Sequence, residues 1–135
     1  MSEKSIILII DDQLSEVKMM KMALEKGNYK VICAYDPTEG INKAKQEMPD
    51  VIILDILMPE KDGLKIAEEL RSDKDCCMIP FIVLTDAGDI FSPSDTIKGP
   101  FIFNLWDEYL EKPINKSILL GIVKKTTVKK KQYEG

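Results

Sequence analysis

The chain has 135 residues, of which 44% are hydrophobic and 31% charged, with a formal net charge of −4 and no histidine. This length and composition fit one globular domain with its own core, and the acidic balance argues against a general nucleic-acid binder. No apolar run is long enough for a signal-peptide core or a membrane span, so we expect a cytoplasmic protein. Without histidine there is no Ser-His or Cys-His nucleophile pair, and the three cysteines lack CxxC spacing, which argues against a zinc site.

Short runs rich in Ile, Val and Leu predict the strands of a sheet. They cover residues 6–10, 31–34, 51–54 and 81–84. Each run is too continuous to leave one face in water, which is typical of a parallel sheet covered by helices on both faces. A shorter fifth strand is expected at Tyr109-Leu110.

Segments with a helical period of apolar residues lie between these strands. The first ends at Gly27, where a left-handed helix cap is expected. The second opens at Asp36-Pro37, the third covers residues 62–71, and Ile114 and Ile118 mark one face of the last. This alternation predicts an α/β fold with a doubly wound sheet and helices on both faces.

Two parts of the chain fit this scheme less well. Residues 86–106, DAGDIFSPSDTIKGPFIFNLW, contain Pro and Gly residues that interrupt any long helix, so we expect a short or irregular fourth helix there. The end of the chain, residues 126–135, is rich in lysine and is expected to form a fraying tail after a domain of residues 1–125.

Polar side chains follow the predicted strands at the points where they end. Asp11-Asp12 follow the first, Asp55 the third, Thr85 the fourth and Lys112 the fifth. Because right-handed crossovers bring the carboxyl ends of parallel strands to one edge of the sheet, we expect these side chains to lie close together. Clustered acids repel one another unless a cation lies among them, and Mg²⁺ prefers such oxygen ligands.

Asp55 is the strongest candidate for accepting a phosphoryl group. An ionised carboxylate needs little help from a base to form an aspartyl phosphate. Phosphoryl transfer then depends on positioning and on neutralising charge, roles that the Lys112 ammonium and the Thr85 hydroxyl match. Pro113 restricts Lys112 to extended geometry and helps to hold it at a strand end.

The ordered set of motifs resembles the receiver domains of two-component response regulators. The set consists of Asp11-Asp12, Asp55 with Met58-Pro59 and Gly63, Thr85, and Lys112-Pro113. Each motif alone is weak, but together they are specific and the resemblance covers nearly the whole chain. It implies a flavodoxin-like sheet of five parallel strands in the order 2-1-3-4-5.

The resemblance also implies a metal site. Asp55 would be the phosphoacceptor and one of the metal residues, and Asp12 would be the direct ligand of Mg²⁺. Asp11 would bind the ion through water, and the backbone carbonyl of Leu57 would complete the protein's share of the ligands.

A switch is implied as well. Thr85 and Lys112 would hold the phosphoryl oxygens. Tyr109 occupies the position of the family's switch aromatic residue and would move together with Thr85 when Asp55 is phosphorylated.

The leading interpretation is a stand-alone receiver in a two-component system or phosphorelay. It would accept a phosphoryl group from a sensor histidine kinase or a histidine phosphotransfer protein and signal to an unknown protein target, without direct binding to nucleic acid or membrane. It would promote its own phosphorylation and dephosphorylation with Mg²⁺ rather than act as an ordinary enzyme. Because no output domain follows residue 135, we expect the output to be a protein contact or passage of the phosphoryl group along a relay.

Departures from the family pattern keep an alternative open. Asp86 stands where the family usually has a small residue, and Leu105-Trp106 replaces a common Gly-Ala pair. A degenerate receiver that binds proteins independently of phosphorylation is therefore the main rival. A phosphatase-like hydrolase would need an acid at Leu57, and isolated glycines disfavour a nucleotide-binding flavodoxin-like protein.

Overall fold

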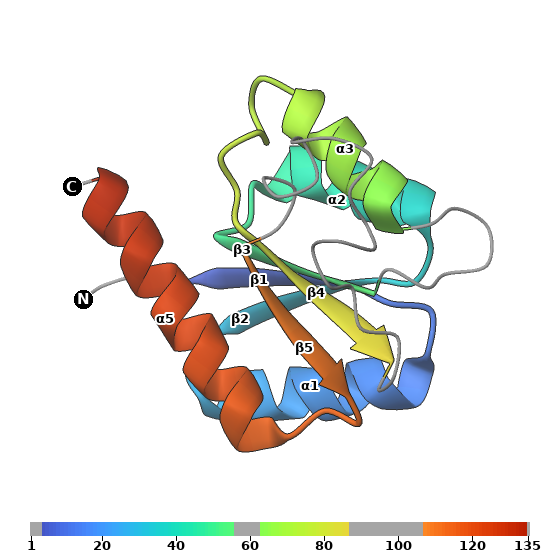
Figure 1. The fold of residues 1–135 in the computed structure, drawn as a ribbon, viewed down its shortest axis with the longest axis vertical. Coiled ribbons are helices and arrows are strands. Elements are labelled where there is room, and N and C mark those ends of the chain that lie inside the picture. Colours follow the sequence, from blue (N-terminus) through green and yellow to red (C-terminus); the bar gives the residue numbers. More distant parts are fainter. Residues whose placement is uncertain (1–3, 56–62, 87–106, 135) are drawn as a thin grey trace, which may run out of the picture.

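The computed structural model describes residues 4–55, 63–86 and 107–134. Its elements are β1 (Ile6–Ile10), α1 (Leu14–Lys26), β2 (Lys30–Ala34), α2 (Pro37–Glu47), β3 (Val51–Asp55), α3 (Gly63–Ser72), β4 (Phe81–Asp86), β5 (Glu108–Lys112) and α5 (Lys116–Glu134). The strands form one parallel sheet in the order β2-β1-β3-β4-β5 (Figure 1). The predicted doubly wound sheet and its strand order are confirmed. Apart from Asp86, which ends β4, the segment expected to hold an irregular fourth helix lies outside the described residues.

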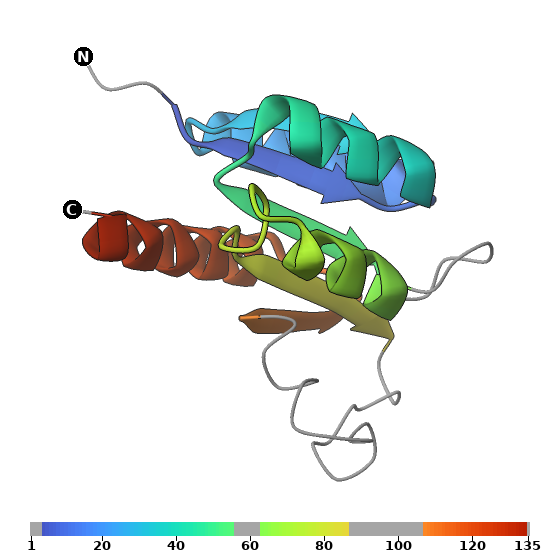
Figure 2. The ribbon, with the colours of Figure 1, turned by 90° about the horizontal axis from the view of Figure 1, so that it is seen from above.

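Two apolar layers enclose the sheet. Helices α1 and α5 cover one face and α2 and α3 cover the other, as two views at right angles show (Figure 1, Figure 2). Alternate residues of β1 enter opposite cores: Ile7 and Ile9 pack with α1 and α5, whereas Leu8 and Ile10 pack with α2 and α3. Every residue of β3 is buried, so the middle of the sheet is a rigid support for whatever follows its strands.

The edge strand β2 differs from the sequence prediction. Val31, Ile32 and Cys33 are only half-buried, although their run predicted burial on both faces. An edge strand has a paired neighbour on one side only, so the covering helices protect it less completely. None of the helices in the described ranges has the length and apolar character that crossing a membrane requires.

Helix α1 ends differently from the prediction. Gly27 has a φ of −81° and is not left-handed, whereas Asn28 has a φ of 74°. Asn tolerates this region better than most side chains. A Cβ on Gly27 would lie 2.9 Å from the Cδ2 atom of Leu120. The glycine at this position therefore permits the close approach of α1 and α5.

Helix α5 extends beyond the predicted end of the domain. Asn115 caps it, because its Oδ1 atom accepts a hydrogen bond of 3.0 Å from the N–H of Ile118. The helix then continues to Glu134, and Thr126 and Thr127 within it are buried. The backbone of residues 126–134 is therefore helical, whereas the expected tail began at residue 126.

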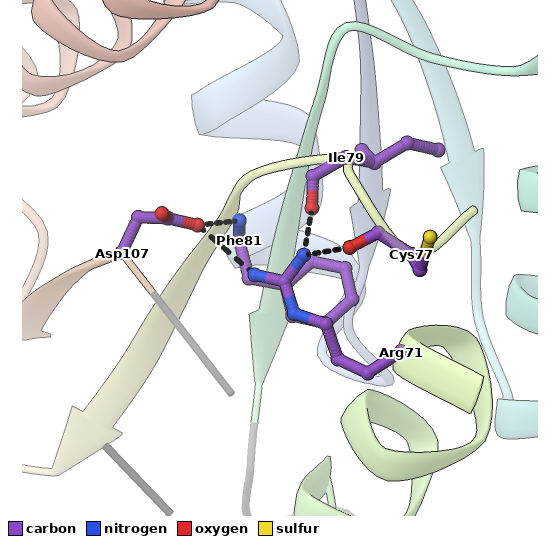
Figure 3. A network of polar contacts seen from close by, with 5 residues as sticks. All are labelled: Arg71, Cys77, Ile79, Phe81 and Asp107. Atoms are coloured by element: carbon purple, nitrogen blue, oxygen red, sulfur yellow. Dashed lines mark hydrogen bonds and ion pairs between the residues drawn. The ribbon is translucent and has the colours of Figure 1, made fainter. Parts of the chain in front are cut away.

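Arg71, in the last turn of α3, joins three segments of the chain (Figure 3). Its Nη1 atom donates hydrogen bonds to the carbonyls of Cys77 at 2.8 Å and Ile79 at 2.7 Å. Its Nη2 atom donates to Oδ2 of Asp107 at 3.1 Å, and the same oxygen accepts from the N–H of Phe81 at 2.8 Å. Because Asp107 directly precedes β5, this network fixes the point at which β5 joins β4.

Candidate functional site

The carboxyl ends of the parallel strands meet at one edge of the sheet, where the strand arrows end in Figure 2. Asp11 follows β1, Asp55 ends β3 and Lys112 ends β5. Since β4 lies between β3 and β5, the side chain of Lys112 crosses the end of β4 to reach Asp55. Its Nζ atom donates a hydrogen bond of 2.9 Å to Oδ2 of Asp55, and both residues are buried.

An acidic cluster adjoins this pair. Asp11, Asp12 and Asp55 each offer a carboxylate oxygen, and these atoms all lie within 4.8 Å of one another. Asp11 and Asp55 are fully buried, whereas Asp12 is partly exposed. Oδ1 of Asp11 accepts a hydrogen bond of 2.9 Å from the N–H of Gln13. Its Oδ2 atom is buried and has no hydrogen-bond partner among the described residues. Three carboxylates with one unsatisfied buried oxygen are a donor set that fits Mg²⁺.

The charge on Asp11 is costly in the absence of a cation. Burial raises the pKa of Asp11 to about 8; the hydrogen bond from Gln13 lowers it, and Glu16 and Asp55 raise it. Buried carboxylates near one another resist ionisation for this reason, and a divalent cation among them favours the charged form.

Lys112 is shared between two carboxylates. Besides its hydrogen bond to Asp55, its Nζ atom lies 3.0 Å from Oε1 of Glu16. Burial alone lowers the pKa of Lys112, but Asp55 and Glu16 raise it well above its usual range, so the ammonium stays charged.

Glu16 was not among the predicted site residues. It lies in the first turn of α1, where an acid ordinarily complements the helix dipole. The sequence therefore contained no signal that Glu16 reaches Lys112. Only the tertiary structure brings the Lys112 side chain of β5 to the Glu16 side chain of α1.

The remaining predicted site residues have different surroundings. Thr85 is buried near the end of β4, in register with Glu111 of β5. Tyr109 is 57% exposed on β5. The predicted carbonyl ligand Leu57 lies outside the described residues, and so does the side chain of Asp86. The structure therefore brings together Asp11, Asp12, Asp55 and Lys112 and adds Glu16 to them.

The fold and site define an α/β protein of the doubly wound class with an acidic pocket and a buried lysine at the carboxyl edge of its sheet. The chain belongs to the response regulator receiver domain family, whose pattern its sequence matches over residues 7–124.

Relatives of known sequence agree with this membership. The chain is 40% identical over 112 residues to the protein named "Probable transcriptional regulator ycf27" of Guillardia theta. It is 36% identical over 109 residues to the alkaline phosphatase synthesis transcriptional regulatory protein PhoP of Bacillus subtilis. These matches cover 83% and 81% of this chain but 41% and 42% of the relatives, so the chain spans less than half of their length.

Solved structures give the same result. A response regulator receiver domain protein from Clostridium thermocellum superposes with a TM-score of 0.81 at 28% identity, covering 96% of this chain and 98% of that one. The chemotaxis response regulator CheY4 of Vibrio cholerae superposes with a TM-score of 0.80 at 28% identity, covering 91% and 98%. The fold therefore extends over nearly the full length of both structures.

Proposed function

We propose that this receiver domain accepts a phosphoryl group on Asp55 from a phosphohistidine of a sensor histidine kinase or histidine phosphotransfer protein. The observation that carries the proposal is the 2.9 Å contact between the Lys112 ammonium and Asp55 beside the acidic cluster. A nucleophilic carboxylate, a fixed positive charge and a set of oxygen ligands are the parts that phosphoryl transfer to an aspartate requires.

The transfer itself is a displacement at phosphorus. A carboxylate oxygen of Asp55 forms a bond to phosphorus as the P–N bond of the phosphohistidine breaks, and the electron pair of that bond returns to the imidazole. Lys112 neutralises charge on the phosphoryl oxygens, and the hydroxyl of Thr85 donates a hydrogen bond to one of them. The buried, permanently charged state of Lys112 supports its part in this step.

Asp11, Asp12, Asp55 and the backbone carbonyl of Leu57 would hold Mg²⁺. When bound, the ion supplies positive charge that offsets the repulsion between these carboxylates and an incoming phosphoryl group. The unsatisfied Oδ2 atom of Asp11 supports this assignment, because a buried anionic oxygen without a partner is costly.

Phosphorylation would be transmitted to a partner through a change in the surface of the domain. Thr85 would move toward the phosphoryl group and Tyr109 would move with it, altering the surface of β5 and α5. Such an equilibrium shifts about tenfold for each 1.4 kcal/mol by which the phosphoryl group prefers one state. The exposure of Tyr109 supports a readout by a protein partner. The net charge of −4 favours such a partner over nucleic acid, and the cytoplasm is the location that suits the exchange.

Phosphorylation by a small P–N donor tests the proposal. The wild type and Asp55→Ala are incubated with phosphoramidate and Mg²⁺, and intact mass is measured. We expect the wild type to gain one phosphoryl group and the variant to gain none. Asp75→Ala, which removes an exposed acid outside the site, is the matched control and should behave as the wild type.

The same experiment separates the proposal from the rival function of a degenerate receiver. Absence of any mass gain in the wild type would favour a module that binds proteins without phosphorylation. Equal gain in the wild type and in Asp55→Ala would place the acceptor elsewhere. Capture of partners by the phosphorylated and unphosphorylated forms then shows whether the modification controls binding.

A further inference from the structure

Glu16 is an acid of the site that neither the receiver pattern nor the acidic cluster accounts for. Its side chain is 21% exposed, and its Oε1 atom is buried 3.0 Å from Nζ of Lys112. It is not among the three acids whose oxygens cluster within 4.8 Å. Glu16 therefore lies outside the three-carboxylate cluster and pairs with Lys112.

The two contacts of Lys112 differ in kind. The contact with Asp55 is a directed hydrogen bond of 2.9 Å. The contact with Glu16 is an ion pair at 3.0 Å, but Oε1 of Glu16 accepts no hydrogen bond from any described residue. Glu16 is thus a second anionic partner of the ammonium, and it raises the pKa of Lys112 less than Asp55 does.

We propose that Glu16 is a positioning residue that competes with the phosphoryl group for Lys112. It thereby weakens the interaction of the site with the phosphoryl group on Asp55. The inference rests on the function proposed above. When the oxygen of Asp55 becomes part of an acyl phosphate, its full negative charge passes to the phosphoryl oxygens. Glu16 remains an anion beside the same ammonium, so the two negative groups share one positive charge.

A second effect follows from the sign of the charge. Glu16 adds a negative charge beside the site, since its Oε1 atom lies 3.0 Å from the ammonium that donates a hydrogen bond to Asp55. Negative potential attracts a divalent cation and repels an incoming anion, and such interactions are strong where solvent is excluded. Glu16 should therefore favour Mg²⁺ and disfavour the phosphoryl group.

The opposite signs of these two effects separate the proposal from a merely structural ion pair. If Glu16 only stabilised the fold, its neutralisation would lower the free energy of unfolding. The affinities for Mg²⁺ and for a phosphoryl analogue would then both stay unchanged or both become weaker. If it competes for Lys112, neutralisation should weaken binding of Mg²⁺ and strengthen binding of a phosphoryl analogue.

The experiment compares Glu16→Gln with Glu108→Gln. Glu108 is a matched control because its side chain is 22% exposed and pairs with Lys125 at 3.0 Å, at the end of β5 opposite to Lys112. Mg²⁺ affinity is measured by titration calorimetry, and beryllofluoride affinity is measured at saturating Mg²⁺. For Glu16→Gln we expect beryllofluoride to bind about tenfold more tightly and Mg²⁺ several-fold more weakly, whereas Glu108→Gln should match the wild type.

The outcomes distinguish this inference from the proposed function. If the wild type binds beryllofluoride but Glu16→Gln binds both ligands as Glu108→Gln does, the role of Glu16 is overturned and phosphorylation of Asp55 stands. If neither the wild type nor Asp55→Ala responds to beryllofluoride with Mg²⁺, the proposed function itself fails. Should Glu16→Gln not fold, Glu16→Asp decides, because it keeps the charge but shortens the reach. That variant should keep the Mg²⁺ affinity and gain part of the beryllofluoride affinity, and no gain would overturn the proposal.

Discussion

Lys112 and Asp55 form a buried ion pair across an intervening strand, with 2.9 Å between Nζ and Oδ2. The side chain of Lys112 is 10% exposed and that of Asp55 is 1% exposed. Neither charge could be buried alone at acceptable cost, because each needs the other to replace lost water. The pair therefore contributes to the stability of the fold and also forms part of the site at the carboxyl edge of the sheet.

Neutralising this lysine should destabilise the metal-free protein. We expect Lys112→Met to lower the free energy of unfolding by about 3 kcal/mol, because it leaves Asp55 without its buried counter-charge. Added Mg²⁺ should restore part of the loss by supplying another positive charge. Urea unfolding with and without Mg²⁺ measures both effects.

Lys125→Met is the matched control for that change. It removes the lysine that pairs with Glu108 at 3.0 Å, where the lysine side chain is 55% exposed. Pairs of this kind contribute about 0 to 1 kcal/mol. Equal losses in the two lysine variants would contradict the special role of the buried pair.

Mg²⁺ affinity should depend on pH through Asp11. Its pKa in the folded, metal-free protein is about 8, above the ordinary value of 3.8, so the folded state holds a proton that Mg²⁺ binding must release. Affinity should therefore rise with pH, by up to about tenfold per unit, and level off above about pH 8. Calorimetry in buffers of different ionisation enthalpy measures the released proton. Asp11→Asn should bind more weakly with a flatter profile, and a steep rise in that variant would point to another group.

The same pKa shift gives the sign of a stability effect. A carboxyl whose pKa is higher in the folded state favours folding fully below about pH 4, and this contribution is lost as the pH rises towards about 8. The free energy of unfolding of the metal-free wild type should therefore fall relative to Asp11→Asn between these values. Denaturant titrations across the range check the difference, and parallel curves would contradict it.

Two helical glycines should respond in opposite directions to alanine. A Cβ on Gly40 would lie 2.8 Å from Cδ1 of the buried Ile10, whereas a Cβ on Gly121 would meet nothing within 4 Å. We expect Gly40→Ala to destabilise by about 1 to 3 kcal/mol through overpacking and Gly121→Ala to stabilise by about 0.5 to 1 kcal/mol through helix propensity. Thermal and denaturant unfolding of both variants measure these changes in stability. Higher stability in Gly40→Ala would show that the core accommodates the added methyl group.

Asp107 should slow amide hydrogen exchange at the first residue of β4. Asp107→Ala removes the acceptor of hydrogen bonds from Phe81 and Arg71, so we expect faster amide exchange at Phe81 and a loss of stability of about 1 kcal/mol. Asp75→Ala, at an exposed acid in the loop before β4, should leave that exchange rate unchanged. Unaltered exchange in Asp107→Ala would mean that backbone pairing alone fixes the start of β5.

Much of the fold was predictable because its signals are local. The apolar runs at residues 6–10 and 51–54 are buried strands, and Asp36 caps α2 by accepting a hydrogen bond of 2.8 Å from the N–H of Glu39. The cap of α1 was misassigned, because a glycine at a helix end satisfies both a turn and a close contact. Only the position of Leu120 shows that Gly27 serves the contact.

The sequence by itself determined the order of strands and helices and the set of polar residues that end the strands, since parallel topology sends those ends to one edge. The tertiary structure alone decided which charges meet there. The side chain of Lys112 pairs with both Asp55 of β3 and Glu16 of α1, a relationship between segments far apart in the chain. An acid in a first helical turn looks the same in sequence whether it faces water or a buried lysine, and packing makes the difference.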